Sequence, residues 1–396
     1  MSDDTTPTRR ECLKYGGAVV GGGLLAGCTG GEADTEAQRT SAGGTATASE
    51  AEPTPTTPKT TTDTAYDVTI EPAGTVTFPS VPDIWVAENA SWADMGVALG
   101  LGKPSAVVLT GEYRTWHYED VPGLSASKDG MTSLWQDGIA KELLYDIDAD
   151  VHFIDPNYLV NLIPNWERAD VKEIAENVGP VCGNTSFSTY PWHEGYPYYD
   201  LYEATEKVAQ VFHRTDRYRA LKTLHDETIS GIRDRLPPEG DRPEVALLSP
   251  GSPEPEKFYP YRIGETTAYK HWRDLGVSDA LADTDIQSFT SDRGTIDFEA
   301  LLEIDPEVLL FYTDRHRTPA AFRETYLSHL QGHDTGQTLT AVQNGEVHPA
   351  GGMYQGPILN LSKTERAAKQ LYPGEFDADE QLYDRQRVAD IVAGNI

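Results

Sequence analysis

Apolar and polar residues alternate along the chain with two different periods. From Tyr66 onward, short runs rich in Val, Ile, Leu and aromatic residues recur between segments in which apolar residues have helical spacing. The predicted strands are residues 67–70, 75–78, 84–86, 106–109, 151–154, 245–248 and 308–312. The predicted helices are residues 92–101, 139–147, 201–212, 215–236, 269–275, 298–302 and 365–371. This alternation is typical of parallel sheets with helices on both faces.

One predicted helix is much longer than the others. Apolar residues recur at helical spacing from Tyr218 to Leu236, Thr215 and Asp216 can cap the start, and Pro237 stops the pattern. A helix of about 22 residues spans roughly 33 Å. The predicted fold class is therefore α/β, with two α/β lobes bridged by one long α-helix. We predict a targeting segment in residues 1–28 and a tether in residues 29–65. The N-terminal lobe then covers residues 66–214, the bridging helix 215–236 and the C-terminal lobe 237–396.

The first 28 residues are typical of an export signal. Arg9 and Arg10 lie in a segment that resembles the twin-arginine signal, and a short, Gly-rich apolar stretch follows. It ends in Leu-Ala-Gly-Cys28, which resembles a lipobox, so we expect Cys28 to carry a lipid that anchors the chain to the extracellular face of the cell membrane. Residues 29–65 are rich in Thr, Pro and Gly without apolar periodicity, which predicts a disordered tether.

Charge and cysteine content narrow the class of protein. The chain has 63 acidic and 32 basic side chains, with a formal net charge of −31. A surface this acidic repels nucleic acid, so we expect no nucleic-acid partner. Acidic residues spread along the whole chain favour a protein of a salt-loving organism; the alternative is an ordinary acidic protein. Of the three cysteines, two lie in the leader, so no disulfide framework is expected.

Five stretches carry a family resemblance. Residues 92–102, 142–151, 298–308, 339–347 and 371–376 resemble, in order, elements of the substrate-binding proteins of iron–siderophore, haem and cobalamin ABC importers. Ala149 departs from the family, which usually has Pro at this place. The resemblance implies a monomeric binding protein rather than an enzyme, with an ABC permease and its ATPase as partners. It also implies that Glu142 and Glu299, at matching positions in two repeated elements, dock on permease arginines; the alternative is that both are solvated helix residues.

Aromatic and polar residues gather in the loops after the predicted strands, where two-lobed α/β proteins bind ligands. Arg can bind carboxylate or catecholate oxygens bidentately, and aromatic faces cover an apolar body, which favours a bulky anionic ligand such as a ferric chelate. The alternatives are surface ion pairs for the arginines and core packing for the aromatics. The predicted ligand contacts are Asn89, Trp92, Tyr113, Arg114, Trp116, Tyr158, Trp192, Tyr196, Tyr259, Tyr261, Arg262, Arg315, His316, Arg317 and Tyr354.

Other activities find less support in the sequence. His329 and His333 have the spacing of metal ligands, but Gly332 makes a shared helical face doubtful and no Glu follows the first His. We therefore expect no metal site built by the protein alone, no cofactor and no catalytic residues; nucleophile-elbow, P-loop and dinucleotide-binding motifs are absent. Cobalamin or haem capture remains the alternative within the same class. An exported surface or sensory module, or an enzyme, is the alternative outside it.

Overall fold

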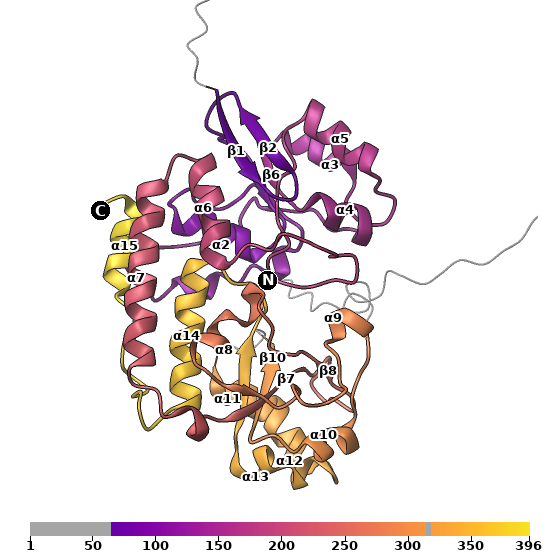
Figure 1. The fold of residues 1–396 in the computed structure, drawn as a ribbon, viewed down its shortest axis with the longest axis vertical. Coiled ribbons are helices and arrows are strands. Elements are labelled where there is room, and N and C mark those ends of the chain that lie inside the picture. Colours follow the sequence, from indigo (N-terminus) through magenta and orange to yellow (C-terminus); the bar gives the residue numbers. More distant parts are fainter. Residues whose placement is uncertain (1–64, 314–317) are drawn as a thin grey trace, which may run out of the picture. The chain divides into compact units, whose positions relative to one another are not determined.

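The computed structural model describes residues 65–313 and 318–396. The predicted export signal, the lipid site Cys28, nearly all of the tether, and the predicted contacts Arg315, His316 and Arg317 lie outside the described residues. The predicted fold class is confirmed, because helices surround two separate sheets of mainly parallel strands (Figure 1).

The N-terminal lobe is built on a four-stranded parallel sheet with the order β5-β4-β3-β6. Its strands are Trp85–Ala87 (β3), Ala106–Val107 (β4), Thr132–Ser133 (β5) and Val151–Phe153 (β6). An antiparallel hairpin, Tyr66–Ile70 (β1) and Gly74–Phe78 (β2), precedes the sheet. The helices of this lobe are Ala90–Ala98 (α2), Lys141–Ile147 (α3), Pro156–Leu162 (α4), Arg168–Asn177 (α5) and Leu201–Val211 (α6).

The C-terminal lobe is built on a five-stranded sheet. The order is β11-β10-β7-β8, with β9 paired to β7, and only β8 runs antiparallel to its neighbour. Its strands are Glu244–Ser249 (β7), Tyr259–Pro260 (β8), Ser278–Asp279 (β9), Val308–Tyr312 (β10) and Val347–Gly351 (β11). The short helices are Lys270–Asp274 (α8), Phe289–Asp292 (α9), Phe298–Ile304 (α10), Pro319–Phe322 (α11), Ser328–Gly332 (α12) and Thr340–Asn344 (α13).

Single turns of other helix types complete the chain between these elements. The 3₁₀ turns are Thr110–Glu112, Thr115–Tyr118, Glu239–Asp241, Thr267–Tyr269 and Gly336–Thr338, and a π-helical turn covers Arg323–Leu327.

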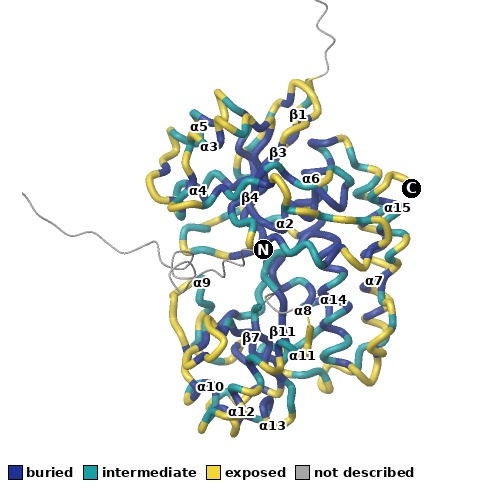
Figure 2. Tube along the Cα trace, turned by 180° about the vertical axis from the view of Figure 1, so that it is seen from behind, coloured by how far each residue is buried: buried dark blue, intermediate teal, exposed yellow. Residues whose placement is uncertain are grey.

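The long helix α7 covers Thr215–Arg233 and follows the last helix of the first lobe (Figure 1). It ends three residues before the predicted boundary at 236. Its inner positions, among them Leu221, Leu224 and Ile232, are buried, whereas its outer positions are exposed (Figure 2). None of the helices in the described part of the chain combines the length and apolar character needed to cross a membrane.

A second helix also joins the two cores, which the sequence did not predict. Pro357–Leu371 (α14) places Ile358 and Leu359 in the core of the first lobe and Ala367 and Ala368 in a core of the second. The apolar pattern predicted only residues 365–371, because the buried polar residues of α14 interrupt it. Arg385–Ala393 (α15), at the end of the predicted C-terminal lobe 237–396, packs against the first lobe, where Val388 and Ile391 join its core.

A buried polar junction holds α14 against α2. Asp94 Oδ2 accepts hydrogen bonds from the backbone N–H groups of Ile358 and Leu359, at 3.0 and 3.1 Å. Ser91 Oγ accepts from the backbone N–H of Gln355 at 3.0 Å. Burial raises the pKa of Asp94 to about 7, although the two N–H donors lower it. This α2–α14 junction gives the first turn of α14 the acceptors that a buried helix end needs.

Arg217 makes the corresponding connection at the start of α7. Its guanidinium donates to the carbonyl of Leu99 at 2.8 Å and to the carbonyl of Val392 at 2.9 Å. These carbonyls belong to the C-terminal ends of α2 and α15, which lack intrahelical donors. One side chain therefore ties the ends of two helices to the bridging helix.

We expect Gly356→Ala to destabilise the protein. A Cβ at this position would lie 2.4 Å from Asp94 Oδ2 and 2.8 Å from the carbonyl oxygen of Ser91. Relieving those contacts should lower the free energy of unfolding by about 1–3 kcal/mol, measured by denaturant titration. The matched control is Gly231→Ala in α7, where a Cβ meets nothing within 4 Å; it should raise stability by up to about 1 kcal/mol through helix propensity. A Gly356→Ala variant as stable as the wild type would contradict this packing.

Candidate functional site

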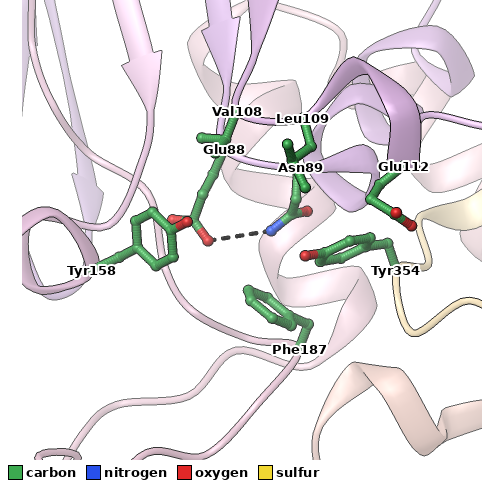
Figure 3. A pocket seen from close by; sticks show the side chains of 8 residues that line it. All are labelled: Glu88, Asn89, Val108, Leu109, Glu112, Tyr158, Phe187 and Tyr354. Carbon is green, nitrogen blue, oxygen red and sulfur yellow. Dashed lines mark hydrogen bonds between the residues drawn. The ribbon is translucent and has the colours of Figure 1, made fainter. Parts of the chain in front are cut away.

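A small, partly enclosed cavity lies at the carboxyl ends of the strands of the first lobe (Figure 3). We call it the inter-lobe cavity, because the β11–α14 loop of the second lobe closes it. Its volume is about 10 Å³, enough for roughly one water-sized group. The residues that line it are Glu88, Asn89, Val108, Leu109, Glu112, Tyr158, Phe187 and Tyr354. Its position agrees with the prediction that the ligand faces the loops after the strands.

Glu88 is a buried carboxyl residue in the cavity wall, 2% exposed, and was not among the predicted site residues. Its backbone extends strand pairing beyond β3: its N–H donates to the carbonyl of Phe153, and its carbonyl accepts from the N–H of Val108. Its Oε2 accepts from the backbone N–H of Asp155 at 2.9 Å. Burial, followed by repulsion from Asp155, raises its pKa well above the usual value.

Asp155 is the fully buried neighbour of Glu88 and has strong hydrogen-bond partners. Its Oδ1 accepts from the backbone N–H of Asn157 at 2.8 Å, which caps α4. Its Oδ2 accepts from Thr185 Oγ1 at 2.7 Å and from Tyr196 Oη at 2.6 Å. Three donors therefore surround the Asp155 carboxyl group, and all of them belong to the protein.

Asn89, one of the predicted ligand contacts, lines the cavity and also caps α2. Its Oδ1 accepts from the backbone N–H of Ser91 at 2.9 Å, and its Nδ2 donates to Glu88 Oε1 at 3.2 Å. Trp92, one turn further on, points into the core instead and stacks on Phe153 with ring centroids 5.3 Å apart. The structure thus brings only the first of these two predicted contacts to the cavity.

Residues 184–199 form an aromatic segment that contacts both lobes. The segment is held to the first lobe by Tyr196, which bonds Asp155 and also accepts from the N–H of Thr185 at 2.7 Å. Across the lobes, the N–H of Thr267 donates to the carbonyl of Ser186 at 2.9 Å. Trp192 stacks on Tyr190 at 4.5 Å and does not line the cavity. The predicted contacts Trp192 and Tyr196 therefore belong to the segment that encloses the cavity.

Tyr354 and Tyr158, two of the predicted ligand contacts, reach the cavity from opposite lobes. Tyr354 packs edge-on against Phe187 with ring centroids 5.1 Å apart. The loop that carries it is held by the buried Lys363, whose Nζ donates to the carbonyls of Gly352 and Tyr354 at 2.6 Å each. A charged donor inside α14 thereby fixes the position of Tyr354.

The predicted contacts that follow β4, Tyr113, Arg114 and Trp116, do not line the cavity. Their neighbour Glu112, which was not a predicted contact, does line it. Tyr113 is fully buried beside Tyr118, with ring centroids 6.1 Å apart. Trp116 stacks on His117 at 3.7 Å, and the Arg366 guanidinium lies 5.2 Å from the centroid of its ring. Arg114, between them, is half-buried and does not line the cavity.

The predicted contacts of the second lobe pack within that lobe. Tyr261 meets Tyr312 edge-on at 5.1 Å, and Tyr259 meets Phe289 at 4.7 Å. The Arg262 guanidinium donates to the carbonyl of Ala282 at 2.6 Å. Among the described residues that line the cavity there is no Arg or Lys; the predicted Arg315 and Arg317 lie outside the described residues.

The His329 and His333 pair does not assemble a metal site. His333 stacks on Phe298 at 3.7 Å, and His329 Nε2 lies 3.3 Å from the carbonyl oxygen of Pro255. Within residues 65–313 and 318–396, no group of three or more His, Cys, Asp or Glu is placed to hold a metal ion.

Glu142 and Glu299 occupy equivalent places in the two lobes. Each is exposed in the first turn of a short helix, α3 or α10, that leads into a parallel strand. Glu299 Oε1 accepts from Thr335 Oγ1 at 3.2 Å. Both helices lie on the side of the described unit away from α7 (Figure 1). Their docking role stays a prediction.

Five of the residues that line the cavity were not among the predicted contacts, namely Glu88, Val108, Leu109, Glu112 and Phe187. Glu88 directly follows the apolar run Trp85–Ala87, and an acidic residue at the end of a buried strand commonly faces a site. Phe187 has no comparable signal, because it lies in an irregular segment with many aromatics.

Comparisons with known proteins agree with this architecture. Residues 159–350 match a family described as periplasmic binding protein. The fold is similar to that of an ABC-type Fe³⁺-hydroxamate transport protein from Saccharomonospora viridis, at 18% identity and a TM-score of 0.51, covering 78% of this chain and 99% of that chain. No curated protein matches the sequence.

Two further solved structures have the same fold. The triscatecholate siderophore binding protein FeuA from Bacillus subtilis is 13% identical with a TM-score of 0.54, covering 78% of this chain and 98% of that one. The periplasmic haem binding protein HutB of Vibrio cholerae is 15% identical with a TM-score of 0.50, covering 74% and 100%. The family resemblance predicted from the sequence is confirmed.

We expect Tyr196→Phe to loosen the aromatic segment. The change removes the hydroxyl that bonds Asp155 and Thr185, and the loss of a buried charged hydrogen bond should cost about 1–2 kcal/mol of unfolding free energy. The matched control is Tyr145→Phe, whose exposed hydroxyl bonds Glu173 and whose loss should leave stability unchanged. Denaturant titration compares the two variants; equal effects would show that Tyr196 does not hold the segment.

We also expect Glu88→Gln to change how stability depends on pH. The raised pKa means that the folded protein keeps the Glu88 proton to a higher pH than the unfolded chain does. The wild type therefore loses stability as pH rises from the unfolded pKa through the folded one, and the Gln variant does not. The stability of the variant relative to the wild type should rise with pH, measured by denaturation from acidic to mildly alkaline buffers. Parallel curves would contradict the buried, protonated Glu88.

Proposed function

We propose that this chain is a solute-binding protein of the ABC importer type, which captures a ferric-siderophore-type chelate between its lobes and delivers it to a membrane permease; the match of residues 159–350 to the periplasmic binding protein family supports this. The matched family and the structural neighbours are substrate-binding proteins, not enzymes. Neighbours of this fold bind a ferric triscatecholate in one case and haem in another. The cargo we propose for this chain is the ferric chelate, with haem or cobalamin as the alternative.

One observation carries this function. Residues from both lobes close a single cavity at the carboxyl ends of the strands, where Tyr158 and Tyr354 meet from opposite sides. A cargo bound there would contact both lobes, so binding and the relative position of the lobes are coupled. The permease can then distinguish loaded from unloaded protein by shape.

The match to a periplasmic binding protein family supports a location outside the cytoplasm. We propose in addition that the protein is exported by the twin-arginine route and anchored by a lipid on Cys28, with residues 29–65 as the tether. The supporting feature is the order of paired arginines, short apolar stretch and Leu-Ala-Gly-Cys in the sequence. The high net negative charge supports a protein that works in concentrated salt.

The cargo is tested by spectroscopy. The protein is purified from its native host, and its absorption spectrum is recorded before and after titration with ferric chelates. A charge-transfer band of a ferric chelate supports the proposal. A Soret band replaces it with haem transport, and a corrin band replaces it with cobalamin transport.

We expect the docking helices to act in delivery and not in capture. Glu142→Lys combined with Glu299→Lys reverses an exposed charge on each lobe, while the cavity is unaffected. Chelate affinity should stay the same, whereas stimulation of the reconstituted permease–ATPase should be lost.

The matched control for this test is Asp146→Lys combined with Glu303→Lys, which changes the same charge on exposed positions of the same two helices. Full stimulation with the control and none with the docking variant supports the role of Glu142 and Glu299. Equal stimulation with both would remove it.

A further inference from the structure

The size of the inter-lobe cavity limits what part of a ligand it can take. A volume of about 10 Å³ accommodates roughly one water-sized group. The body of a ferric chelate is far larger, so it must lie at the mouth of the cavity. Only a compact terminal group of the ligand can occupy the cavity as the structure has it.

The lining favours a compact cation. It combines the Glu88 carboxyl with the Asn89 amide and three aromatic rings, those of Tyr158, Phe187 and Tyr354 (Figure 3). Aromatic faces attract a cation, and carboxyl and amide oxygens accept its N–H groups. Among the lining residues that the structure describes there is no basic side chain to repel it.

Glu88 is the carboxyl that remains available to a ligand. All the donors around Asp155 come from the protein, through Asn157, Thr185 and Tyr196. Glu88 has two protein donors, the N–H of Asp155 and the amide of Asn89. A carboxylate offers about four acceptor positions, so Glu88 retains acceptor capacity on the cavity side.

Basic side chains lie near residues of the cavity wall and of the aromatic segment. The charge of Lys128 interacts with that of the lining residue Glu112, and the charge of Arg293, in the second lobe, acts on Tyr190 of the aromatic segment. These cations suit the oxygen atoms of a chelate body at the mouth. They leave Glu88 as the acidic partner for whatever group passes further in.

We infer that the inter-lobe cavity receives a protonated amine at the end of the bound chelate, with Glu88 as its counter-ion and Tyr158, Phe187 and Tyr354 as its walls. This inference rests on the proposed function and narrows it. A chelate that carries an alkylammonium group, such as an amine-bearing tris-hydroxamate, fits the cavity. A tris-catecholate, which is multiply anionic and has no such group, does not.

The site also couples binding to proton release. Burial and Asp155 keep Glu88 protonated to a higher pH than usual, and an ammonium group beside it favours the ionised form. Glu88 therefore loses its proton when the amine binds. Affinity for the amine-bearing chelate should fall as pH falls through the range in which Glu88 titrates.

The test compares two ferric chelates that differ only in charge. The probes are ferrioxamine B, which ends in a primary ammonium group, and its N-acetyl derivative, in which the same nitrogen is neutral. Titration calorimetry with the wild-type protein should show tighter binding of the ammonium form by at least about tenfold. Repetition in buffers of different ionisation enthalpy should show proton release with ferrioxamine B and none with the acetylated form.

Glu88→Gln should bring the two affinities to within about twofold of each other, because it removes the counter-ion. Glu176→Gln, an exposed change on α5, is the matched control and should keep the preference. If Glu88→Gln does not fold, the comparison of the two probes on the wild type decides alone. Equal affinities for the two probes, or tighter binding of a ferric tris-catecholate, would overturn this inference and leave the proposed function intact. Failure of every ferric chelate to bind would overturn both.

Discussion

The first turn of α14 lies inside the protein, and its backbone N–H groups must find acceptors there. Asp94 supplies them from α2 of the N-terminal lobe, and Gly356 leaves the space that the carboxyl group needs. Because α14 is anchored at this point, the loop before it, which carries Tyr354, is anchored too. The α2–α14 junction thus sets the geometry of the inter-lobe cavity from the buried side.

The two buried carboxyl groups of the cavity have different roles because their surroundings differ. Asp155 receives donors from α4 and from the aromatic segment, so its charge organises the protein around it. Glu88 is bonded less completely and lines the cavity wall. Because Glu88 is buried with fewer hydrogen-bond donors than Asp155, its carboxyl group can respond to a ligand, whereas Asp155 contributes to structure.

The spacing of apolar residues along the chain was sufficient to predict the helices and strands whose buried faces are apolar. The strands from β3 to β10 that contain Val, Ile and Leu runs, and the helix α7, were predicted close to their observed bounds. The helix α14 was only half predicted, because Asn360, Lys363 and Thr364 are polar yet buried. Trp92 and Tyr113 were assigned to the site because they follow strands, but strand ends also supply core residues, and only packing distinguishes the two. Glu88 was missed although it directly follows the apolar run Trp85–Ala87, because its contact with Asp155 and its place in the cavity wall appear only in the fold.

The return of α15 to the first lobe has a consequence for biosynthesis. Val388 and Ile391 complete a core that begins with the hairpin at Val68, and Arg217 binds the carbonyl of Val392. The N-terminal lobe can therefore reach its final packing only after the ribosome has made almost the entire chain. The last step in the packing of this lobe is therefore the docking of α15, after translation of the segments between them.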